Sequence, residues 1–348
     1  MRITAATKLS ICIATYKRGA FIGETLDSIL NQMEPGVEIV VVDGASPDNT
    51  RDVMARYVSN YPEIRYFCEP VNSGVDADFD KAVGYARGDY CWLMTDDDLL
   101  KSGALKTVLS TLGGGDDLII VNSEIRNADM SVVFEKQRLV SDADKQYRAA
   151  DKEELFSDTA AYLSFIGCVV IRREYWLSRA RDIYYGTLFI HVGVIFQSPP
   201  VEKVRVIANP LIAVRYGNAM WTSRGFEIWM FKWPKLIWSF PDFSDVSKRK
   251  VCRRDPWRSA KTLFYNRALG AYAVDEFRRF WPGNTGPVKR FVAYVLSIFP
   301  ASLANFVMVV YFSTLARPAP MALHDLLFSR NAGMLSRVSA RVLARWIH

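Results

Sequence analysis

The chain lacks the motifs that usually build disulfide frameworks and dinucleotide-binding loops. Of its 348 residues, only three are histidine and five are cysteine, and no two cysteines form a CxxC pair. An odd number of unpaired cysteines predicts reduced core residues in a cytosolic compartment. The loop after the first predicted strand contains neither GxGxxG nor GxxxxGK[ST], which argues against a dinucleotide-binding or P-loop fold.

The N-terminus also lacks a secretory signal. Lys8 and Lys17 leave too short an apolar stretch between them, and Leu9–Ala14 is predicted to be a strand instead. We therefore expect that the N-terminus is not a signal peptide.

Negative charge is scarce in the C-terminal part of the chain. Residues 1–215 carry 24 Lys and Arg against 30 Asp and Glu, whereas residues 216–348 carry 20 against 7. The excess of +13 predicts an anionic partner, either nucleic acid or the inner leaflet of a membrane.

A long uncharged run decides between these two partners. Residues 291–316 contain no charged side chain, which nucleic-acid binding does not explain. As one helix they would span about 39 Å, more than the roughly 30 Å of a hydrocarbon core. Pro300 interrupts the run, so we expect two interfacial helices that meet there, with a true span or a buried helix pair as alternatives.

The last segment also favours a membrane surface. Arg337, Arg341 and Arg345 recur every four residues and would share one helix face, with Trp346 near the end. A basic amphipathic helix of this kind suits lipid headgroups, although a helix docked on the protein is the alternative.

The first 125 residues alternate between strand and helix patterns. Apolar runs predict strands at Leu9–Ala14, Val37–Val42, Ile64–Cys68, Tyr90–Met94 and Leu118–Val121, with helical spacing between them and a helix expected to start at Ser46-Pro47. Such alternation predicts an α/β fold with a mostly parallel sheet flanked by helices. Later segments predict separate strands at Val204–Ala208 and Leu211–Arg215 and mostly helices over residues 226–280.

Polar residues follow four of these strands and should meet at one edge of the sheet. They lie in Ala14–Arg18, at Asp43, in Asn72–Asp76 and in the triplet Asp96–Asp98. The carboxyl ends of parallel strands are where ligands bind in such sheets. Three adjacent carboxylates repel one another unless a cation lies among them, so the triplet predicts a Mg²⁺ or Mn²⁺ site that shares a diphosphate. An acidic turn that caps the helix near Lys101 is the alternative.

Four ordered motifs resemble the family 2 glycosyltransferases, which have the GT-A fold. They are Leu9–Arg18, Glu38–Thr50, Asn72–Gly74, and Gly88–Tyr90 with Asp96–Asp98. A narrower likeness extends to residue 222 and is similar to the bacterial abequosyltransferase-type enzymes, which add a dideoxyhexose to lipid-linked O-antigen units. It rests on Gly88–Trp92, Tyr162–Ser164, Ile171–Trp176 and Pro210–Arg215.

The resemblance implies roles for individual residues. Asp98, helped by Asp96, would hold Mn²⁺ or Mg²⁺ on the diphosphate, and Asp97 would act on the sugar side in catalysis or cap the next helix. The residues expected to bind the nucleotide-sugar are Thr15, Tyr16, Arg18, Asp43, Asn72, Gly74, Asp76 and Asp96.

The chain departs from the family pattern where a catalytic carboxylate is usual. The stretch Tyr185–Gly193 contains no acid but includes His191, which would serve as the base or complete the metal shell, or else is a structural histidine. The residues expected on the acceptor side are Arg215, Tyr216, Asn218 and Trp221.

The sequence therefore predicts a glycosyltransferase that uses a CDP-, UDP-, GDP- or dTDP-linked sugar. Its acceptor would be a lipid-linked saccharide at the cytoplasmic face of a bacterial inner membrane. Expected domains are residues 1–222 for catalysis, 223–285 as a helical connection and 286–348 for membrane association. A nucleotidyltransferase and a non-catalytic nucleic-acid-binding protein are the competing interpretations.

Overall fold

The computed structural model describes residues 7–218, 224–283, 285–316 and 319–345, which fall into two compact units. The first unit contains residues up to Tyr216 together with Phe240–Val251. The second contains Gly217–Ser239 and the chain from Cys252 onward. The predicted division at residue 285 does not correspond to a break between these units.

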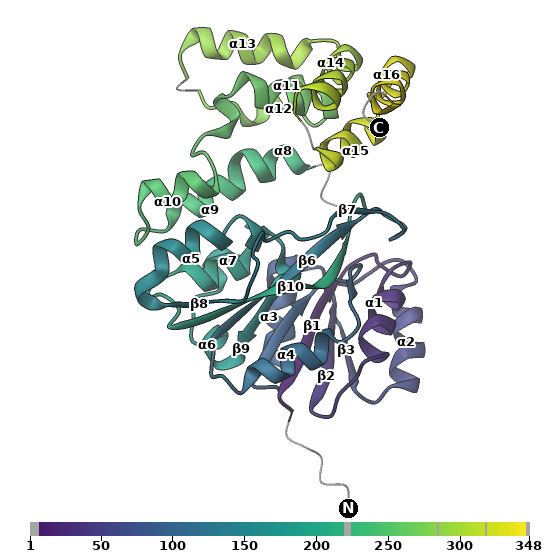
Figure 1. The fold of residues 1–348 in the computed structure, drawn as a ribbon, viewed down its shortest axis with the longest axis vertical. Coiled ribbons are helices and arrows are strands. Elements are labelled where there is room, and N and C mark those ends of the chain that lie inside the picture. The colour runs from purple at the N-terminus through teal and green to yellow at the C-terminus, as the bar shows by residue number, and fades with distance from the viewer. Residues whose placement is uncertain (1–6, 219–223, 284, 317–318, 346–348) are drawn as a thin grey trace, which may run out of the picture. The chain divides into compact units, whose positions relative to one another are not determined.

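A ten-stranded sheet organises the first unit (Figure 1). Its path is β3-β2-β1-β4-β9-β6-β10-β5, with β7 beside β6 and β8 beside β10. The strands are β1 (Leu9–Thr15), β2 (Val37–Asp43), β3 (Ile64–Cys68), β4 (Tyr90–Met94), β5 (Leu99–Leu100), β6 (Leu118–Arg126), β7 (Val133–Glu135), β8 (Lys145–Arg148), β9 (Val169–Arg172) and β10 (Lys203–Arg215). Strands β1 to β4 run parallel to one another, and β9 runs antiparallel to both β4 and β6.

Register brings the ends of the first strands together. Thr15, the last residue of β1, is paired with Asp43, the last residue of β2, and Asp43 in turn is paired with Cys68 of β3. All residues of β1, β2 and β4 are buried, because both faces of this parallel sheet are covered. Polar side chains can therefore reach solvent only where these strands end.

Helices cover the two faces of the sheet. They are α1 (Ile22–Leu30), α2 (Thr50–Asn60), α3 (Val75–Tyr85), α4 (Ala104–Leu112), α5 (Lys152–Thr159), α6 (Arg173–Leu177) and α7 (Ile190–Phe196), and α10 (Asp245–Val251) packs against α5. Apolar side chains of α1, α2 and α4 join Leu9, Ile11 and Trp92 in one core cluster. The expected α/β architecture is confirmed.

Two local predictions were wrong. The predicted strands on either side of Asn209-Pro210 form one continuous strand, β10, which accommodates the proline at a register shift between Ile207 and Ile212. Helix α2 begins at Thr50, after the N-cap Asn49, and not at Ser46-Pro47. Ser46 instead accepts a hydrogen bond from the Lys17 N–H.

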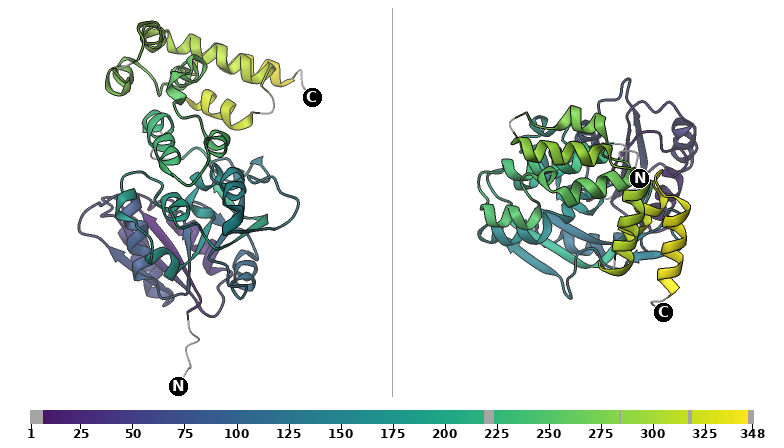
Figure 2. Two further views of the ribbon diagram at one scale, coloured as in Figure 1. Left: turned by 90° about the vertical axis from the view of Figure 1, so that its left-hand side faces the viewer. Right: turned by 90° about the horizontal axis from the view of Figure 1, so that it is seen from above.

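The described elements of the second unit are all helical (Figure 2). They are α8 (Gly225–Glu227), the π-helical turn Ile228–Lys232, α9 (Trp233–Ser239), the 3-10 turn Pro256–Arg258, α11 (Ala260–Leu269), α12 (Val274–Phe280), α13 (Pro287–Ile298), α14 (Ala301–Thr314), α15 (Pro320–Phe328) and α16 (Met334–Arg345). Helices α13 and α14 meet at Pro300 with a bend of 97°. The predicted break is therefore present.

Candidate active site

The loop after β1 is held by side chains of the loop after β2. Three consecutive backbone N–H groups donate hydrogen bonds: Lys17 to Ser46 Oγ at 2.9 Å, Arg18 to Thr50 Oγ1 at 3.1 Å and Gly19 to Asp48 Oδ2 at 3.2 Å. Ser46 therefore supports this loop instead of capping α2. The arrangement fixes the backbone that carries Tyr16 and Arg18.

Arg18 joins this loop to the acidic triplet. Its Nε lies 3.4 Å from Asp96 Oδ1, and its Nη2 lies 3.4 Å from Asp97 Oδ2. The side chains of Asp96 and Asp97 are each 13% exposed. The sequence prediction that these residues meet at one edge of the sheet is confirmed by these contacts.

Asp98 is the most buried carboxylate of the triplet, at 2% exposure. Its Oδ1 accepts a hydrogen bond from the backbone N–H of Arg215 at 2.7 Å, and its Oδ2 accepts one from the Thr95 hydroxyl. Each oxygen keeps a second lone pair. Asp98 is thus fixed by β10, while Asp96 and Asp97 reach the surface.

Arg215 supports the triplet and is not placed to receive an acceptor. Its Nε donates to the Asp97 carbonyl at 2.9 Å, its Nη1 donates to the Ala128 carbonyl at 2.6 Å, and its Nη2 pairs with Glu24. The residue is only 8% exposed. The acceptor-side role predicted for Arg215 is therefore corrected, because its donors are already used to hold the loop.

Phe21 and Glu24 were missed by the sequence reasoning. The guanidinium groups of Arg18 and Arg215 lie 5.6 and 5.4 Å from the centre of the Phe21 ring, within the range of cation–π attraction. Glu24 completes the set as the partner of Arg215. Their spacing fits an ordinary first helical turn, so no signal in the sequence distinguishes them.

The triplet carries more negative charge than its surroundings compensate. Burial, and next the charge of Asp97, raises the pKa of Asp96 to about 7 and that of Asp98 to about 8. No group of three or more His, Cys, Asp or Glu side chains among the described residues has the geometry of a metal cage. Mg²⁺ and Mn²⁺ often bind through one or two carboxylates plus phosphate oxygens. The residues fit such a shared site.

Asp43 lies at the end of β2 with no exposed surface. Its Oδ2 accepts from the Tyr66 hydroxyl at 2.7 Å, and its Oδ1 accepts from the Ser46 N–H at 2.8 Å. The carboxylate therefore shapes the turn beside Thr15, which is 2% exposed. Tyr16 is half-buried, and Lys17 Nζ lies 5.2 Å from its ring centre.

The loop after β3 approaches the loop after β2 through a glycine. Asn72 Oδ1 accepts from the Gly74 N–H at 2.8 Å, and Gly74 is the N-cap of α3 with φ of 90°, a conformation that favours glycine. A Cβ added to Gly44 would lie 2.6 Å from Asp78 Oδ2. Asp78 is 3% exposed, and burial raises its pKa. It is a further residue that the sequence reasoning missed.

Asp76 anchors a distant segment. Its oxygens accept from the N–H groups of Leu188 at 2.8 Å and Ile190 at 3.0 Å, and the residue is 3% exposed. The Asp76 carboxylate, which was predicted to contact the nucleotide, therefore positions the backbone of residues 188–190.

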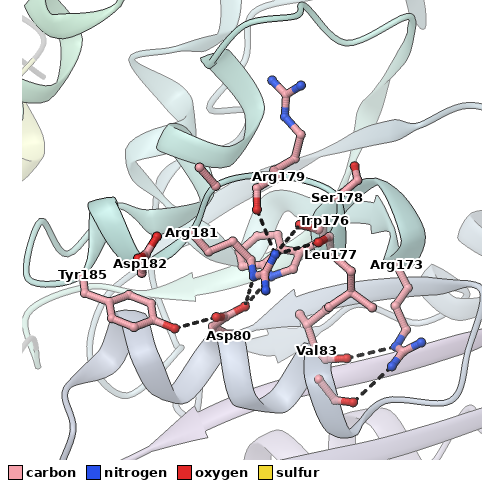
Figure 3. Close-up of polar contacts among 12 residues, drawn as sticks. Asp80, Val83, Arg173, Trp176, Leu177, Ser178, Arg179, Arg181, Asp182 and Tyr185 are labelled. Carbon is pink, nitrogen blue, oxygen red and sulfur yellow. Dashed lines mark hydrogen bonds and ion pairs between the residues drawn. The ribbon is translucent and has the colours of Figure 1, made fainter.

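One turn later, Asp80 fixes the same region (Figure 3). It accepts hydrogen bonds from Trp176 Nε1 at 2.8 Å and from the Tyr185 hydroxyl at 2.5 Å, and pairs with Arg181 Nε at 2.8 Å. Because Asp76 and Asp80 are four residues apart, they share one face of α3. This face holds the stretch Tyr185–Gly193 in place.

His191 lies in the core. It is 1% exposed, and its Nε2 is 2.6 Å from the Leu163 carbonyl, which it meets as an N–H donor. Burial lowers the pKa of His191 to about 4. An acceptor hydroxyl cannot reach this ring, so the role of His191 as base or metal ligand is corrected to a structural one.

Of the remaining acceptor-side residues, Tyr216 lies in the first unit. The Tyr216 N–H donates to the Arg126 carbonyl at 2.9 Å, and its ring meets Phe134 edge to face at 6.1 Å. Asn218 is half-buried and belongs to the second unit. Trp221 lies outside the described residues.

Comparisons with known proteins find glycosyltransferases that are similar to this chain. The model of the family "Glycosyl transferase family 2" matches residues 10–179. Abequosyltransferase RfbV of Salmonella typhimurium is 28% identical over 230 residues, which cover 62% of this chain and 69% of RfbV. A Campylobacter jejuni GalNAc(5)-diNAcBac-PP-undecaprenol beta-1,3-glucosyltransferase is 28% identical over 39% of this chain and 45% of its own length.

A solved structure extends the likeness of fold. Staphylococcus aureus TarS 1-349, crystallised in complex with UDP, superposes with a TM-score of 0.53 at 15% identity, covering 97% of this chain and 92% of the TarS 1-349 chain. At this identity the match concerns the fold, which is GT-A. The family match shows that residues 10–179 form a glycosyltransferase domain of family 2, and the shared fold agrees with this assignment.

Proposed function

We propose that the chain transfers a sugar from a nucleoside-diphosphate donor with the help of Mn²⁺ or Mg²⁺. The observation that carries this proposal is the excess of buried negative charge at Asp96–Asp98, where burial and Asp97 raise the pKa of two carboxyl groups. A divalent cation there would neutralise the charge that develops on the departing nucleoside diphosphate.

The chain's own residues fit the parts of such a donor. Tyr16 offers a half-buried ring against which a base can stack, close to the ends of β1 and β2. Asp96 and Asp98 would hold the cation, and Arg18, already at the triplet, is near enough to meet phosphate oxygens. Asp97, 13% exposed, is assigned to the sugar side.

The acceptor is proposed to be a lipid-linked saccharide. Support comes from relatives: RfbV is named an abequosyltransferase, and the Campylobacter enzyme is named for an acceptor joined to PP-undecaprenol. These are properties of those proteins. They favour a hydroxyl of a lipid-linked saccharide for this chain and an O-antigen-like polysaccharide as its product.

The second unit is proposed to bind a membrane at the cytoplasmic face. No single described helix is long and apolar enough to cross a bilayer, while α13 and α14 satisfy the length and composition only as a bent pair. Helix α13 exposes Val288, Phe291 and Ile298 at 74%, 67% and 51%. Exposed Lys289 and Arg290 adjoin them. An apolar helix face beside cations suits an anionic interface.

A ligand screen tests the catalytic proposal. The melting temperature of the full chain is measured with CDP, UDP, GDP and dTDP, each with Mn²⁺ or with chelator. One nucleotide should raise it only when metal is present, because a ligand bound to the folded state stabilises that state. Equal stabilisation in chelator, together with sugar transfer by Asp98→Ala, would refute the metal–diphosphate site.

A further inference from the structure

The second unit contains a hollow of about 400 Å³ between α9 and the turn Pro256–Arg258. Its floor is aromatic and belongs to the core of the unit. Trp257 is 5% exposed, stacks on Phe231 with ring centroids 6.3 Å apart and meets Trp281 edge to face at 5.0 Å. Core packing on several sides makes this floor rigid.

Two cations line the hollow. Lys235 and Arg254 are exposed, and neither forms an ion pair with a carboxylate among the residues that the structure describes. The guanidinium of Arg254 lies 5.4 Å from the centre of the Trp238 ring, and Trp238 Nε1 donates to the Cys252 carbonyl at 3.3 Å. The ring is thus held from two sides.

The single carboxylate of the lining is already compensated. Asp255 Oδ2 lies 3.3 Å from Arg258 Nε. The hollow is therefore positive overall, and its volume lies within the range of about 300–1,000 Å³ typical of small-ligand sites. Ammonium and guanidinium groups bind phosphate oxygens strongly, while indole faces accept apolar chains and sugar rings.

We propose that this hollow binds the diphosphate of the lipid-linked acceptor, with Lys235 and Arg254 on phosphate oxygens and Trp238 against the adjoining chain or sugar. The inference rests on the proposed function, since it locates a part of the proposed acceptor. It concerns a surface of the second unit and does not depend on the residues at the acidic triplet.

Calorimetry with farnesyl diphosphate in detergent micelles tests the site on the full chain. Chelator is present, so that metal-dependent binding at the triplet does not contribute. We expect Lys235→Gln/Arg254→Gln to weaken binding by about tenfold or more, because two charged hydrogen bonds are lost. The control Arg278→Gln/Arg279→Gln removes the same charge from an exposed end of α12 and should stay within about twofold of wild type. Equal losses in both variants would overturn the proposal.

Further probes separate the sources of phosphate. Trp238→Ala should weaken the binding of farnesyl diphosphate and leave the weaker binding of inorganic pyrophosphate unchanged. Phosphatidylglycerol vesicles should bind the two Gln double variants equally. If Lys235→Gln/Arg254→Gln lost vesicle binding but still bound farnesyl diphosphate, the hollow would be assigned to bulk lipid headgroups and the inference would be rejected.

Activity distinguishes this inference from the proposed function. With a lipid-linked acceptor, Lys235→Gln/Arg254→Gln should raise the acceptor KM while kcat and nucleotide-dependent stabilisation remain. An unchanged acceptor KM rejects the hollow but leaves the glycosyltransferase proposal standing. Normal farnesyl diphosphate binding by a wild-type chain that binds no nucleoside diphosphate would instead reject the catalytic proposal alone.

Discussion

The guanidinium Nε of Arg18 lies 3.4 Å from Oδ1 of Asp96, so the chain places its own cation on the carboxylates assigned to a metal. Arg18 lowers the pKa of Asp96, while burial and Asp97 raise it more. The same cation that stabilises the triplet therefore competes with a metal for it.

Arg18→Ala tests this competition. Without nucleotide, the variant should bind Mn²⁺ several-fold more tightly at pH 8.5, because no guanidinium occupies the carboxylates. With nucleoside diphosphate it should bind the complex more weakly, since a phosphate partner is lost. Titration calorimetry measures both, and Arg18→Lys, which keeps the charge, should change metal affinity less. Identical Mn²⁺ affinities in wild type and Arg18→Ala would contradict the competition.

Asp98→Asn should stabilise the protein at alkaline pH. Because the pKa of Asp98 is raised to about 8 when folded, the folded state holds a proton that the unfolded chain releases near pH 4. Wild-type stability therefore falls as pH rises from about 4 to 8. Asn keeps an acceptor for the Arg215 N–H and offers a donor to Thr95 without this penalty.

Melting curves at pH 5 and pH 8.5 measure the difference. The melting temperature of Asp98→Asn should exceed that of wild type only slightly at pH 5 and by a few degrees at pH 8.5. A change of 1 kcal/mol moves Tm by about 2–4 °C in domains of 150–250 residues. Turnover should be lost because the metal loses a charged ligand. A variant that melts below wild type at pH 8.5 would show that the Asp98 carboxylate stabilises the fold as an anion.

The sequence predicted the sheet better than the details of its edge. β-Branched runs fix the strands, and parallel strands place their carboxyl ends together, so the meeting of Arg18 with the triplet was foreseeable. The sequence did not show which carboxylate of the triplet turns inward, because that depends on the pairing of β5 with β10. His191 is buried because α7 packs in the core. The short apolar stretch of α7 does not distinguish a core helix from a helix that lines an active site.

Asp80→Ala should destabilise the first unit. Trp176 and Tyr185 would lose a hydrogen-bond acceptor, and Arg181 would lose the carboxylate of its ion pair. Breaking a largely buried ion pair such as Asp80–Arg181 costs at most about 3–5 kcal/mol. We expect a loss of about 2–4 kcal/mol in urea unfolding. Asp80→Asn, which retains an acceptor for Trp176, should lose less.

An exposed pair provides the comparison for Asp80. Asp245 lies 3.4 Å from Arg249 on α10, with both side chains at least 60% exposed. Asp245→Ala should change stability by less than about 1 kcal/mol. Similar urea midpoints for Asp80→Ala and Asp245→Ala would mean that the contacts of Asp80 do not hold residues 176–185 in place.

Membrane binding by the second unit depends on the outer face of α13. Phe291→Ser/Ile298→Ser replaces two side chains that are 67% and 51% exposed, so the fold should tolerate the change. Each of these side chains contributes about 1.5–3 kcal/mol when fully buried in an apolar phase, so partition into anionic vesicles should fall at least tenfold. Flotation with phosphatidylglycerol vesicles measures this, and Val132→Ser/Val140→Ser, at 51% and 92% exposure in the first unit, should float like wild type. If the α13 variant floats as well as that control, the cations alone hold the protein at the lipid surface, and binding should then vanish in high salt.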